Sequence, residues 1–272
     1  MYRGSCMPTD GSLISKTDKQ PLVFVIMPCF NSEQYIGRAI ESVISQTYSN
    51  WQLLVIDDGS TDESVSVVRS FAEKDLRVHI IVNENNFGTA KTRNRGFDLF
   101  RGDYAALLDS DDIWLPEKLE KQVRLAEKSR ADIIYCSYRM IDENGNRLWD
   151  DFIVPTVTDF NYMLSSSVIS CSTALLSGNI VERYRFPETL YHEDYAFWMM
   201  LLRDGAKACG VQEVLAEYRI RAGSRASDKW KVAQGRWHIY RKVLKLPLWK
   251  SGEVFIRYMC NGLHKYRKQV RK

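Results

Sequence analysis

Three aspartates stand within four residues in the segment Asp109-Ser110-Asp111-Asp112. The apolar run Ala105–Leu108 comes directly before them, so they follow a strand that the sequence predicts to be buried. Carboxylates this close repel one another unless a positive group lies among them, and the hard ions Mg²⁺ and Mn²⁺ prefer oxygen ligands. Because side chains alternate along an extended segment, Asp109 and Asp111 should face the same side. We therefore predict that Asp109 and Asp111 bind Mn²⁺ or Mg²⁺.

The same alternation turns Asp112 away from that side, where it would cap the helix expected from Pro116. The alternative interpretation of the whole acidic cluster is a capped loop without chemistry.

A second acidic loop, Asp57-Asp58-Gly59-Ser60-Thr61-Asp62, follows another apolar run. Thr61 or Asp62 is placed to cap the next helix. Either Asp57 or Asp58 should point into a cleft at the end of its strand. A carboxylate there can accept a hydrogen bond from a base N–H such as uracil N3.

Three basic residues, Lys91, Arg93 and Arg95, stand in the first turns of the helix predicted over Thr89–Phe100. Arginine makes bidentate contacts to phosphate, and a helix N-terminus adds a favourable dipole. These residues therefore favour a diphosphate ligand. At least one of the three can equally belong to a solvated basic face.

The acidic loops described above each lie between a predicted strand and the helix that follows it, and strand and helix patterns alternate regularly along the chain. In the first helix, Asn31 is expected as the N-cap, with Gln34 completing a capping box. Alternating strands and helices predict an α/β fold with a mainly parallel, Rossmann-like sheet flanked by helices, which binds ligands beyond the carboxyl ends of its strands. The predicted strands are Leu22–Met27, Gln52–Ile56, Val78–Val82, Tyr104–Leu108, Ile133–Tyr138, Ser172–Leu176 and Val211–Arg219.

Composition narrows the class of protein. The 272 residues are 45% hydrophobic and 26% charged, as in ordinary globular proteins. No apolar run reaches the roughly 18 residues of a membrane span, and the polar first 20 residues do not resemble a secretory signal, so we expect a cytoplasmic protein. The six cysteines are scattered, which argues against a zinc site or a disulfide framework.

Five segments, taken in order, resemble family 2 inverting glycosyltransferases of the GT-A fold, and bacterial relatives with this organisation build surface polysaccharide. The resemblance covers about residues 22–220, and the order of the segments is more specific than any one of them. The segments are Pro28-Cys29-Phe30-Asn31, Asp57–Asp62, Arg93-Asn94-Arg95-Gly96, Leu108–Asp112 and His192-Glu193-Asp194-Tyr195-Ala196-Phe197-Trp198.

The resemblance implies donor-binding roles for seven residues. They would hold a UDP-sugar, with a nucleoside pocket, a diphosphate contact and an Asp-x-Asp metal element. These residues are Pro28, Phe30, Asp58, Arg93, Asp109, Ser110 and Asp111.

The same resemblance makes Asp194 the general base that takes a proton from the acceptor hydroxyl, while Glu193 would orient the acceptor. A single displacement would give a β-linkage from an α-linked donor. The alternative for Asp194 is an N-cap of the helix predicted over residues 195–203.

Two departures from the family pattern stand out. Many relatives carry a metal-binding histidine after a Tyr-Arg pair, but here Arg221 follows Tyr218-Arg219 at that place. An arginine cannot ligate a metal but can clamp a diphosphate. Gln234-Gly235-Arg236-Trp237 is one residue short of the Gln-x-x-Arg-Trp element of processive relatives, so we expect the addition of a single sugar.

The domain organisation follows from these patterns. We expect a flexible leader over 1–20, a GT-A catalytic domain over 21–226 and a helical basic tail over 227–272. Within the catalytic domain, 21–130 would bind the nucleotide-sugar and 131–226 the acceptor.

The tail is strongly basic and amphipathic. Residues 229–272 hold 13 Lys or Arg and one acid, Glu253, so they carry +12 while the rest of the chain carries −8. Two helices separated by Pro247 would either pack on the domain or lie on an anionic membrane surface. The second arrangement suits a peripheral enzyme with a lipid-linked or lipopolysaccharide glycan as acceptor.

Three other classes of protein remain as alternatives. A nucleic-acid-binding protein could use the basic tail, but the acidic loops contribute nothing to that function, so no nucleic acid is expected. A nucleotidyltransferase lacks support, since no Gly-rich loop follows the first strand. A catalytically silent UDP-sugar binder would use the same site without turnover.

Overall fold

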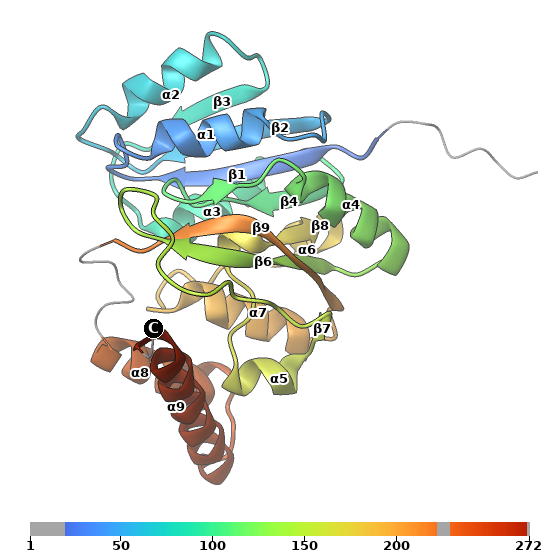
Figure 1. Ribbon diagram of the computed structural model, residues 1–272, viewed down its shortest axis with the longest axis vertical. Helices are drawn as coiled ribbons and strands as arrows, with labels where there is room; N and C mark the ends of the chain where they lie inside the picture. Colours follow the sequence, from blue (N-terminus) through green and yellow to red (C-terminus); the bar gives the residue numbers. More distant parts are fainter. Residues whose placement is uncertain (1–19, 222–228, 271–272) are drawn as a thin grey trace, which may run out of the picture.

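The computed structural model describes residues 20–221 and 229–270. A nine-stranded sheet crosses the molecule, with helices on both of its faces (Figure 1). Its first half is parallel throughout, because β1 pairs with β2 and β4, and β2 pairs with β3. The bounds are β1 Val23–Cys29, β2 Trp51–Asp57, β3 Val78–Val82 and β4 Tyr104–Leu107.

The second half of the sheet mixes directions. Strand β8 pairs antiparallel with β4 on one side and with β6 on the other, and β9 then runs parallel to β6. The short β5 and β7 each pair antiparallel with β9. The predicted parallel sheet is therefore confirmed for the first half, and β8 reverses the direction beyond it. The bounds are β5 Ile113–Trp114, β6 Ile133–Ile141, β7 Val157–Thr158, β8 Leu175–Ser177 and β9 Ala208–Arg219.

One face of the sheet is covered by α1, α2 and α4, and the other face by α3, α5, α6 and α7. The bounds are α1 Ile36–Ile44, α2 Ser64–Ala72, α3 Thr89–Asp98, α4 Lys118–Ser129, α5 Phe160–Ser165, α6 Gly178–Arg183 and α7 Glu193–Arg203, with a 3₁₀ turn at Cys171–Thr173.

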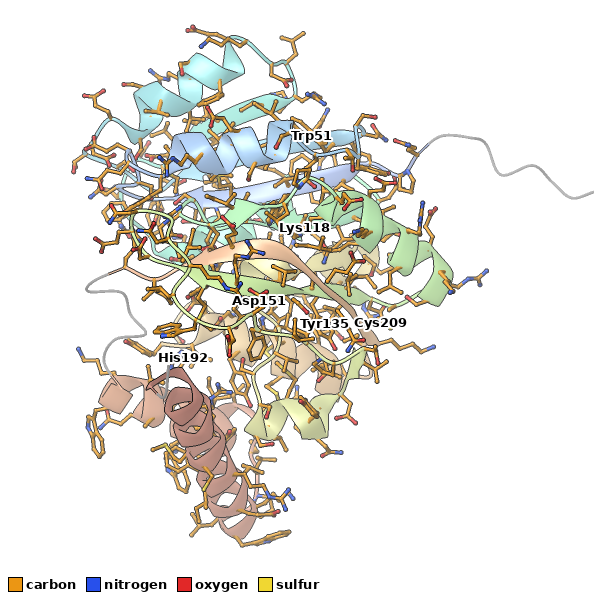
Figure 2. The ribbon with its side chains drawn as sticks, in the orientation of Figure 1. Trp51, Lys118, Tyr135, Asp151, His192 and Cys209 are labelled. Atoms are coloured by element: carbon orange, nitrogen blue, oxygen red, sulfur yellow. The ribbon has the colours of Figure 1, made fainter. Side chains whose placement is uncertain are left out.

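Strand β1 supplies side chains to both faces, because successive residues of a strand point to opposite sides. Val23 and Val25 enter the core under α1 and α4, which also contains Trp51 (Figure 2). Phe24 and Ile26 enter the core on the opposite face. All seven residues of β1 are buried, as expected of a central parallel strand.

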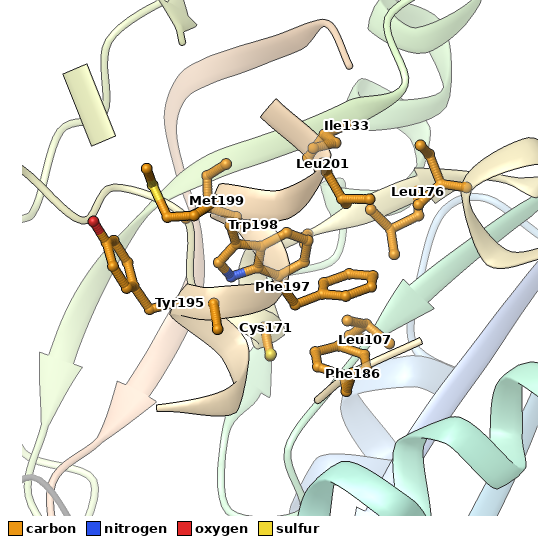
Figure 3. Packing of buried hydrophobic residues seen from close by; sticks show 14 of the residues in the cluster. Leu107, Ile133, Cys171, Leu176, Phe186, Tyr195, Phe197, Trp198, Met199 and Leu201 are labelled. Carbon is orange, nitrogen blue, oxygen red and sulfur yellow. The ribbon is translucent and has the colours of Figure 1, made fainter. Parts of the chain in front are cut away.

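The second core is built around α7. Phe186 and Phe197 stack with ring centroids 4.0 Å apart, and Trp198 meets Phe197 edge-on at 5.1 Å (Figure 3). Every residue from Tyr195 to Met199 is buried. Helix α7 is therefore buried over most of its circumference, and its first turn is fixed by the packing of the turns that follow.

The predicted capping box at Asn31 is wrong. Helix α1 begins at Ile36, five residues later, and Asn31 has a positive φ of 46°. Its backbone N–H donates to Ser60 Oγ, and its side-chain oxygen accepts from the Thr61 N–H. Asn31 therefore joins the loop after β1 to the loop after β2 instead of starting a helix.

The tail forms two helices separated by Pro247, as predicted. The first is α8 Lys229–His238, continued by a π-helical turn at Ile239–Val243, and the second is α9 Leu248–Val270. Ile239, Tyr240 and Val254 are buried against the α7 side of the domain. The tail therefore packs on the domain, and among the described residues no helix is long and apolar enough to cross a membrane.

Candidate active site

A cleft of about 460 Å³ opens at the carboxyl ends of β1, β2 and β4 and is closed on its far side by the start of α7. It lies where ligands bind in open α/β sheets. All nine residues to which the family resemblance gave a donor, acceptor or catalytic role line it: Pro28, Phe30, Asp58, Arg93, Asp109, Ser110, Asp111, Glu193 and Asp194.

Arg93 joins the two sides of the cleft. Its Nη2 lies 2.5 Å from Asp109 Oδ1 after β4, and its Nη1 lies 3.5 Å from Glu193 Oε1 in α7. Burial lowers the pKa of the Arg93 guanidinium, but the Asp109 and Glu193 carboxylates raise it above its ordinary value. Arg93 therefore stays charged and ties the acidic loop to the first turn of α7.

Gly96 allows Arg93 to reach both carboxylates. A Cβ added to Gly96, three residues after Arg93 in α3, would stand 2.5 Å from Ile26 Cγ2 on β1. Helix α3 thus approaches the sheet more closely than a side chain at this position would permit. The close approach carries Arg93 to the ends of the strands and explains the glycine in the Arg93–Gly96 segment.

Asp111 is paired with Arg221, the residue at which the sequence departs from the family pattern. Asp111 Oδ2 lies 2.7 Å from Arg221 Nε, and the two side chains are 17% and 37% exposed. Burial and the neighbouring Asp109 carboxylate raise the pKa of Asp111 above its ordinary value, although Arg221 opposes the shift. A cation beside Asp111 is therefore favourable, and Arg221 supplies one.

Asp112 does not cap the helix after Pro116, contrary to the prediction. Its Oδ2 accepts from the Ser172 hydroxyl, and its Oδ1 accepts from the Arg219 backbone N–H at 2.8 Å. Burial raises its pKa well above the ordinary range, with Asp111 and Asp109 adding to the shift. Asp112 lines the same cleft as its two neighbours but is buried, and its carboxylate fastens the acidic loop to the 3₁₀ turn and to β9.

Asp58, not Asp57, lines the cleft, and its carboxylate organises the loop after β3. One oxygen accepts from Asn83 Nδ2 at 2.7 Å and from the Phe87 N–H at 3.0 Å, and the other accepts from the Gly88 N–H at 2.8 Å. The side chain of Asp57 turns back to the Ser60 N–H. Asp58 therefore shapes the wall of the cleft that the loop after β3 forms.

The three basic residues at the start of α3 do not share one role, as the alternative of a solvated basic face expected. Of Lys91, Arg93 and Arg95, only Arg93 lines the cleft. The Arg95 side chain donates to Asn83, and Lys91 Nζ stands 4.1 Å from the Phe87 ring centroid.

Glu193 and Asp194 occupy the first turn of α7, whose N-cap is His192. Asp194 is therefore inside the helix, and the N-cap alternative is wrong. Two acids at a helix N-terminus are stabilised by the helix dipole. Asp194 Oδ1 accepts from the Tyr195 N–H at 2.7 Å, which aims the carboxylate.

Sequence reasoning missed several residues around the cleft. Arg219 donates from Nε to the Asp111 carbonyl oxygen at 2.8 Å, and Ser172 Oγ accepts from the Asp109 N–H at 3.0 Å. Ser32 and Ser110 share a hydrogen bond of 2.8 Å. Ser172 lies sixty residues beyond Asp112, so local spacing in the sequence could not predict its contact with the acidic loop.

Comparison with known proteins agrees with this geometry. Residues 24–185 match the family described as Glycosyl transferase family 2. The chain belongs to this family. It is a glycosyltransferase.

Two curated relatives match nearly the whole glycosyltransferase. TuaG of Bacillus subtilis, named for teichuronic acid biosynthesis, is 33% identical over 92% of this chain and 99% of its own. WfgD of Escherichia coli, a UDP-Glc:alpha-D-GlcNAc-diphosphoundecaprenol beta-1,3-glucosyltransferase, is 34% identical over 90% of this chain and 95% of its own.

Among solved structures, TarS of S. aureus in complex with UDP-GlcNAc superimposes with a TM-score of 0.67. The match covers 87% of this chain and 71% of that chain at 20% identity. At that identity the likeness shows the fold, which is the predicted GT-A fold.

The carboxylate oxygens available in the cleft fit a divalent ion, which enzymes of this family commonly use. Asp109 and Asp111 offer two carboxylates on one side of the cleft. Among the described residues, no group of three or more His, Cys, Asp or Glu could hold a metal. Mg²⁺ and Mn²⁺ often take one or two carboxylates together with substrate phosphates, so a two-carboxylate set is sufficient.

Substituting Arg93 tests the two ion pairs that connect the acidic loop to the start of α7. Arg93→Met leaves Asp109 and Glu193 without their cation, so the free energy of unfolding should fall by about 3–5 kcal/mol in urea denaturation. Arg257→Met is the matched control, because Arg257 makes an exposed pair with Glu253 at 2.8 Å. Its loss should cost at most about 1 kcal/mol. Equal losses in the two variants would contradict the assigned role.

Proposed function

We propose that this glycosyltransferase moves one hexose or N-acetylhexosamine from a UDP-sugar to an acceptor hydroxyl, with inversion to a β-linkage. The observation that carries the proposal is a single cleft lined by acids from three parts of the chain. Asp58 follows β2, Asp109 and Asp111 follow β4, and Asp194 lies in the first turn of α7. These parts match the nucleoside, the diphosphate and the acceptor of a sugar-nucleotide reaction.

The nucleoside part is a pocket of about 250 Å³ that adjoins the cleft. Phe30, Asp58, Asn86 and Gly88 are among the residues that line it. Phe30 is 44% exposed, so its ring is available to stack on a base. A carboxylate has about four acceptor positions and Asp58 uses three, which leaves one for uracil N3–H. The TarS complex with UDP-GlcNAc supports a uridine donor on the same fold.

Asp109 and Asp111 would hold a divalent ion in the diphosphate part of the cleft. When bound, such an ion neutralises charge that develops on the departing UDP. Three arginines line the cleft, and two of them, Arg93 and Arg219, are buried. The side chain of Arg221 is 37% exposed and already lies at Asp111. Its guanidinium can transfer from that carboxylate to a phosphate oxygen when the donor binds.

Asp194 acts as the general base. It removes the proton of the acceptor hydroxyl as that oxygen attacks the anomeric carbon from the side opposite UDP. The bond to UDP breaks as the new glycosidic bond forms, so configuration inverts once. Glu193, which is held by Arg93 at 3.5 Å, would orient the acceptor beside it.

The acceptor is proposed to be a lipid-linked or lipopolysaccharide glycan of the bacterial surface. WfgD is named for transfer to a diphosphoundecaprenol-linked sugar, and TuaG for a cell-wall polymer. An enzyme that stays in the cytoplasm meets such an acceptor at the inner face of the membrane. The tail is the part of the chain suited to that surface.

Helix α9 carries an outward apolar stripe opposite the face that packs on the domain. Trp249, Ile256 and Met259 are 72%, 64% and 44% exposed, whereas Ser251 and Val254 on the other side are buried. Lys250 and Arg257 flank the stripe. Apolar and basic side chains on one exposed helix face favour an anionic lipid surface, where the chain would lie peripherally.

Binding of the donor should depend on the metal ion. UDP-sugars should raise the melting temperature in Mn²⁺ or Mg²⁺, by far more than GDP-sugars, and at 100 times Kd the gain in unfolding free energy is about 2.7 kcal/mol. EDTA and the Asp111→Asn variant should each remove most of that shift in a thermal-shift assay. A shift that is unchanged by both would exclude a role for the ion in donor binding.

Removal of the base should separate chemistry from binding. Asp194→Asn should abolish sugar transfer while UDP affinity stays near that of the wild type, because Asp194 does not line the nucleoside pocket. Asp204→Asn at the other end of α7 is the control and should transfer at the wild-type rate. Sustained turnover by Asp194→Asn would end the assignment.

Membrane binding should depend on the stripe. The double variant Trp249→Ser/Ile256→Ser should lose co-sedimentation with phosphatidylglycerol vesicles, and the wild type should not sediment with neutral phosphatidylcholine vesicles. Leu76→Ser/Val82→Ser is the control, because it removes exposed apolar side chains that lie at β3, far from the tail (Figure 1). If the stripe variant sediments like the control, the tail is not the membrane surface.

A further inference from the structure

The first tail helix packs directly on the residues that precede the acidic pair of α7. A Cβ added to Gly235 of α8 would stand 2.9 Å from His192 Cδ2 and 3.4 Å from Tyr191 Cβ. His192 Nε2 lies 3.1 Å from the Val232 carbonyl oxygen, also in α8. Figure 2 labels His192 where the domain meets the tail. The N-cap of α7 is therefore held in place by α8.

The residue after the acidic pair is held by the same helix. The Arg236 guanidinium is buried, and its Cζ lies 3.3 Å from the ring centroid of Tyr195 and 4.5 Å from that of Tyr258 in α9. Its Nε and Nη1 have no hydrogen-bond partner among the described residues. A buried guanidinium stacked on tyrosine rings gains cation–π attraction, which is strongest when water is excluded.

Tyr195 is fixed from its other side as well. Its hydroxyl donates to the Met163 carbonyl oxygen of α5 at 3.0 Å. The ring is thus held between Arg236 and α5, directly after Asp194 in the chain. The residues on both sides of Glu193 and Asp194 contact α8 or are stacked by it.

We propose that α8, through Gly235 and Arg236, positions the first turn of α7 for catalysis, so that the tail is part of the catalytic apparatus. The proposal rests on the proposed role of Asp194 as the base. Gly235 and Arg236 are positioning residues, because they act through His192 and Tyr195 and do not line the cleft. Reacting groups must be held within a fraction of an ångström, and a misplacement of about 1 Å can cost 10²-fold in rate.

No described residue of the tail lines the donor-binding side of the cleft. The residues of that side come from the ends of β1, β2, β4 and β9, from the start of α3 and, at Glu193, from α7. A disturbance of α8 should therefore lower kcat while donor KM and UDP affinity stay the same. A residue that only stabilised the fold would affect all three together with the melting temperature.

Two tail glycines provide a matched test. Gly235→Ala forces a methyl group against His192, whereas Gly252→Ala in α9 places one where nothing lies within 4 Å. Both changes replace a helical glycine with alanine, so neither should lower helix stability. We expect Gly235→Ala to lower kcat by up to about 10²-fold, with donor KM unchanged, and Gly252→Ala to match the wild type.

The outcome is read from kcat, donor KM, UDP affinity and melting temperature of the full chain, with Asp194→Asn assayed in parallel. Equal kcat for the two glycine variants would overturn the positioning role while an inactive Asp194→Asn left the proposed function standing. Turnover by Asp194→Asn would instead overturn the function on which the proposal rests. A fall of kcat in Gly235→Ala that came with equal losses of UDP affinity and melting temperature would show a merely structural role.

Arg236 allows a second test that does not depend on the glycine. In a double-mutant cycle, Arg236→Met and Tyr195→Leu should each lower kcat, and their effects should not add, because both remove the same stacked contact. Additive effects would overturn the role of the Arg236–Tyr195 contact.

Discussion

The site depends on neutralising an acidic loop that cannot be stable by itself. Asp109, Asp111 and Asp112 follow β4 without a gap long enough to separate their charges. Arg93 pairs with the first and Arg221 with the second. Asp112, which is fully buried, is held by hydrogen bonds from Ser172 and from the Arg219 backbone. Each acid therefore has its own partner from outside the acidic loop.

These partners give the three acids different properties. Asp109 and Asp111 keep their oxygens toward the cleft, where a cation can exchange for an arginine. Asp112 lies behind them in a medium that disfavours its charge and raises its pKa. The same three-acid segment thus supplies two candidate ligands and one anchor, and the anchor keeps the backbone of the other two in place.

The reversal of strand direction at β8 creates the second wall of the cleft. The parallel half ends its strands at one edge and offers loops for a nucleotide. Strand β8, which is antiparallel to β4, brings the 3₁₀ turn with Ser172 beneath the acidic loop. The chain that follows can then place α7 opposite β4, with its N-terminus and its two acids facing the cleft. The tail packs on the outer side of the start of α7, where α8 contacts Tyr191 and His192.

The sequence alone determined most of the parallel first half of the sheet, because its strands and helices follow from local residue patterns. Buried runs such as Val23–Cys29 have the apolar residues of parallel strands, and the carboxyl ends of such strands meet at one edge, so spacing alone placed Asp109 at the cleft together with either Asp57 or Asp58. The resemblance to the family chose Asp58 and Arg93, and it added Asp194, which no nearby pattern marks. The capping box at Asn31 failed because hydrogen bonds to Ser60 and Thr61, thirty residues away, outweigh a local propensity.

Only the tertiary structure decided which charges meet. Asp112 and Ser172 are sixty residues apart, and Asp111 and Arg221 more than a hundred, so their pairing depends on how β8 and β9 enter the sheet. The contact of Arg236 with Tyr195 likewise needs the tail to fold back on α7. Spacing along a chain fixes which residues share a strand or a helix face. It does not fix which distant segments become neighbours, since that is set by the packing of the whole core.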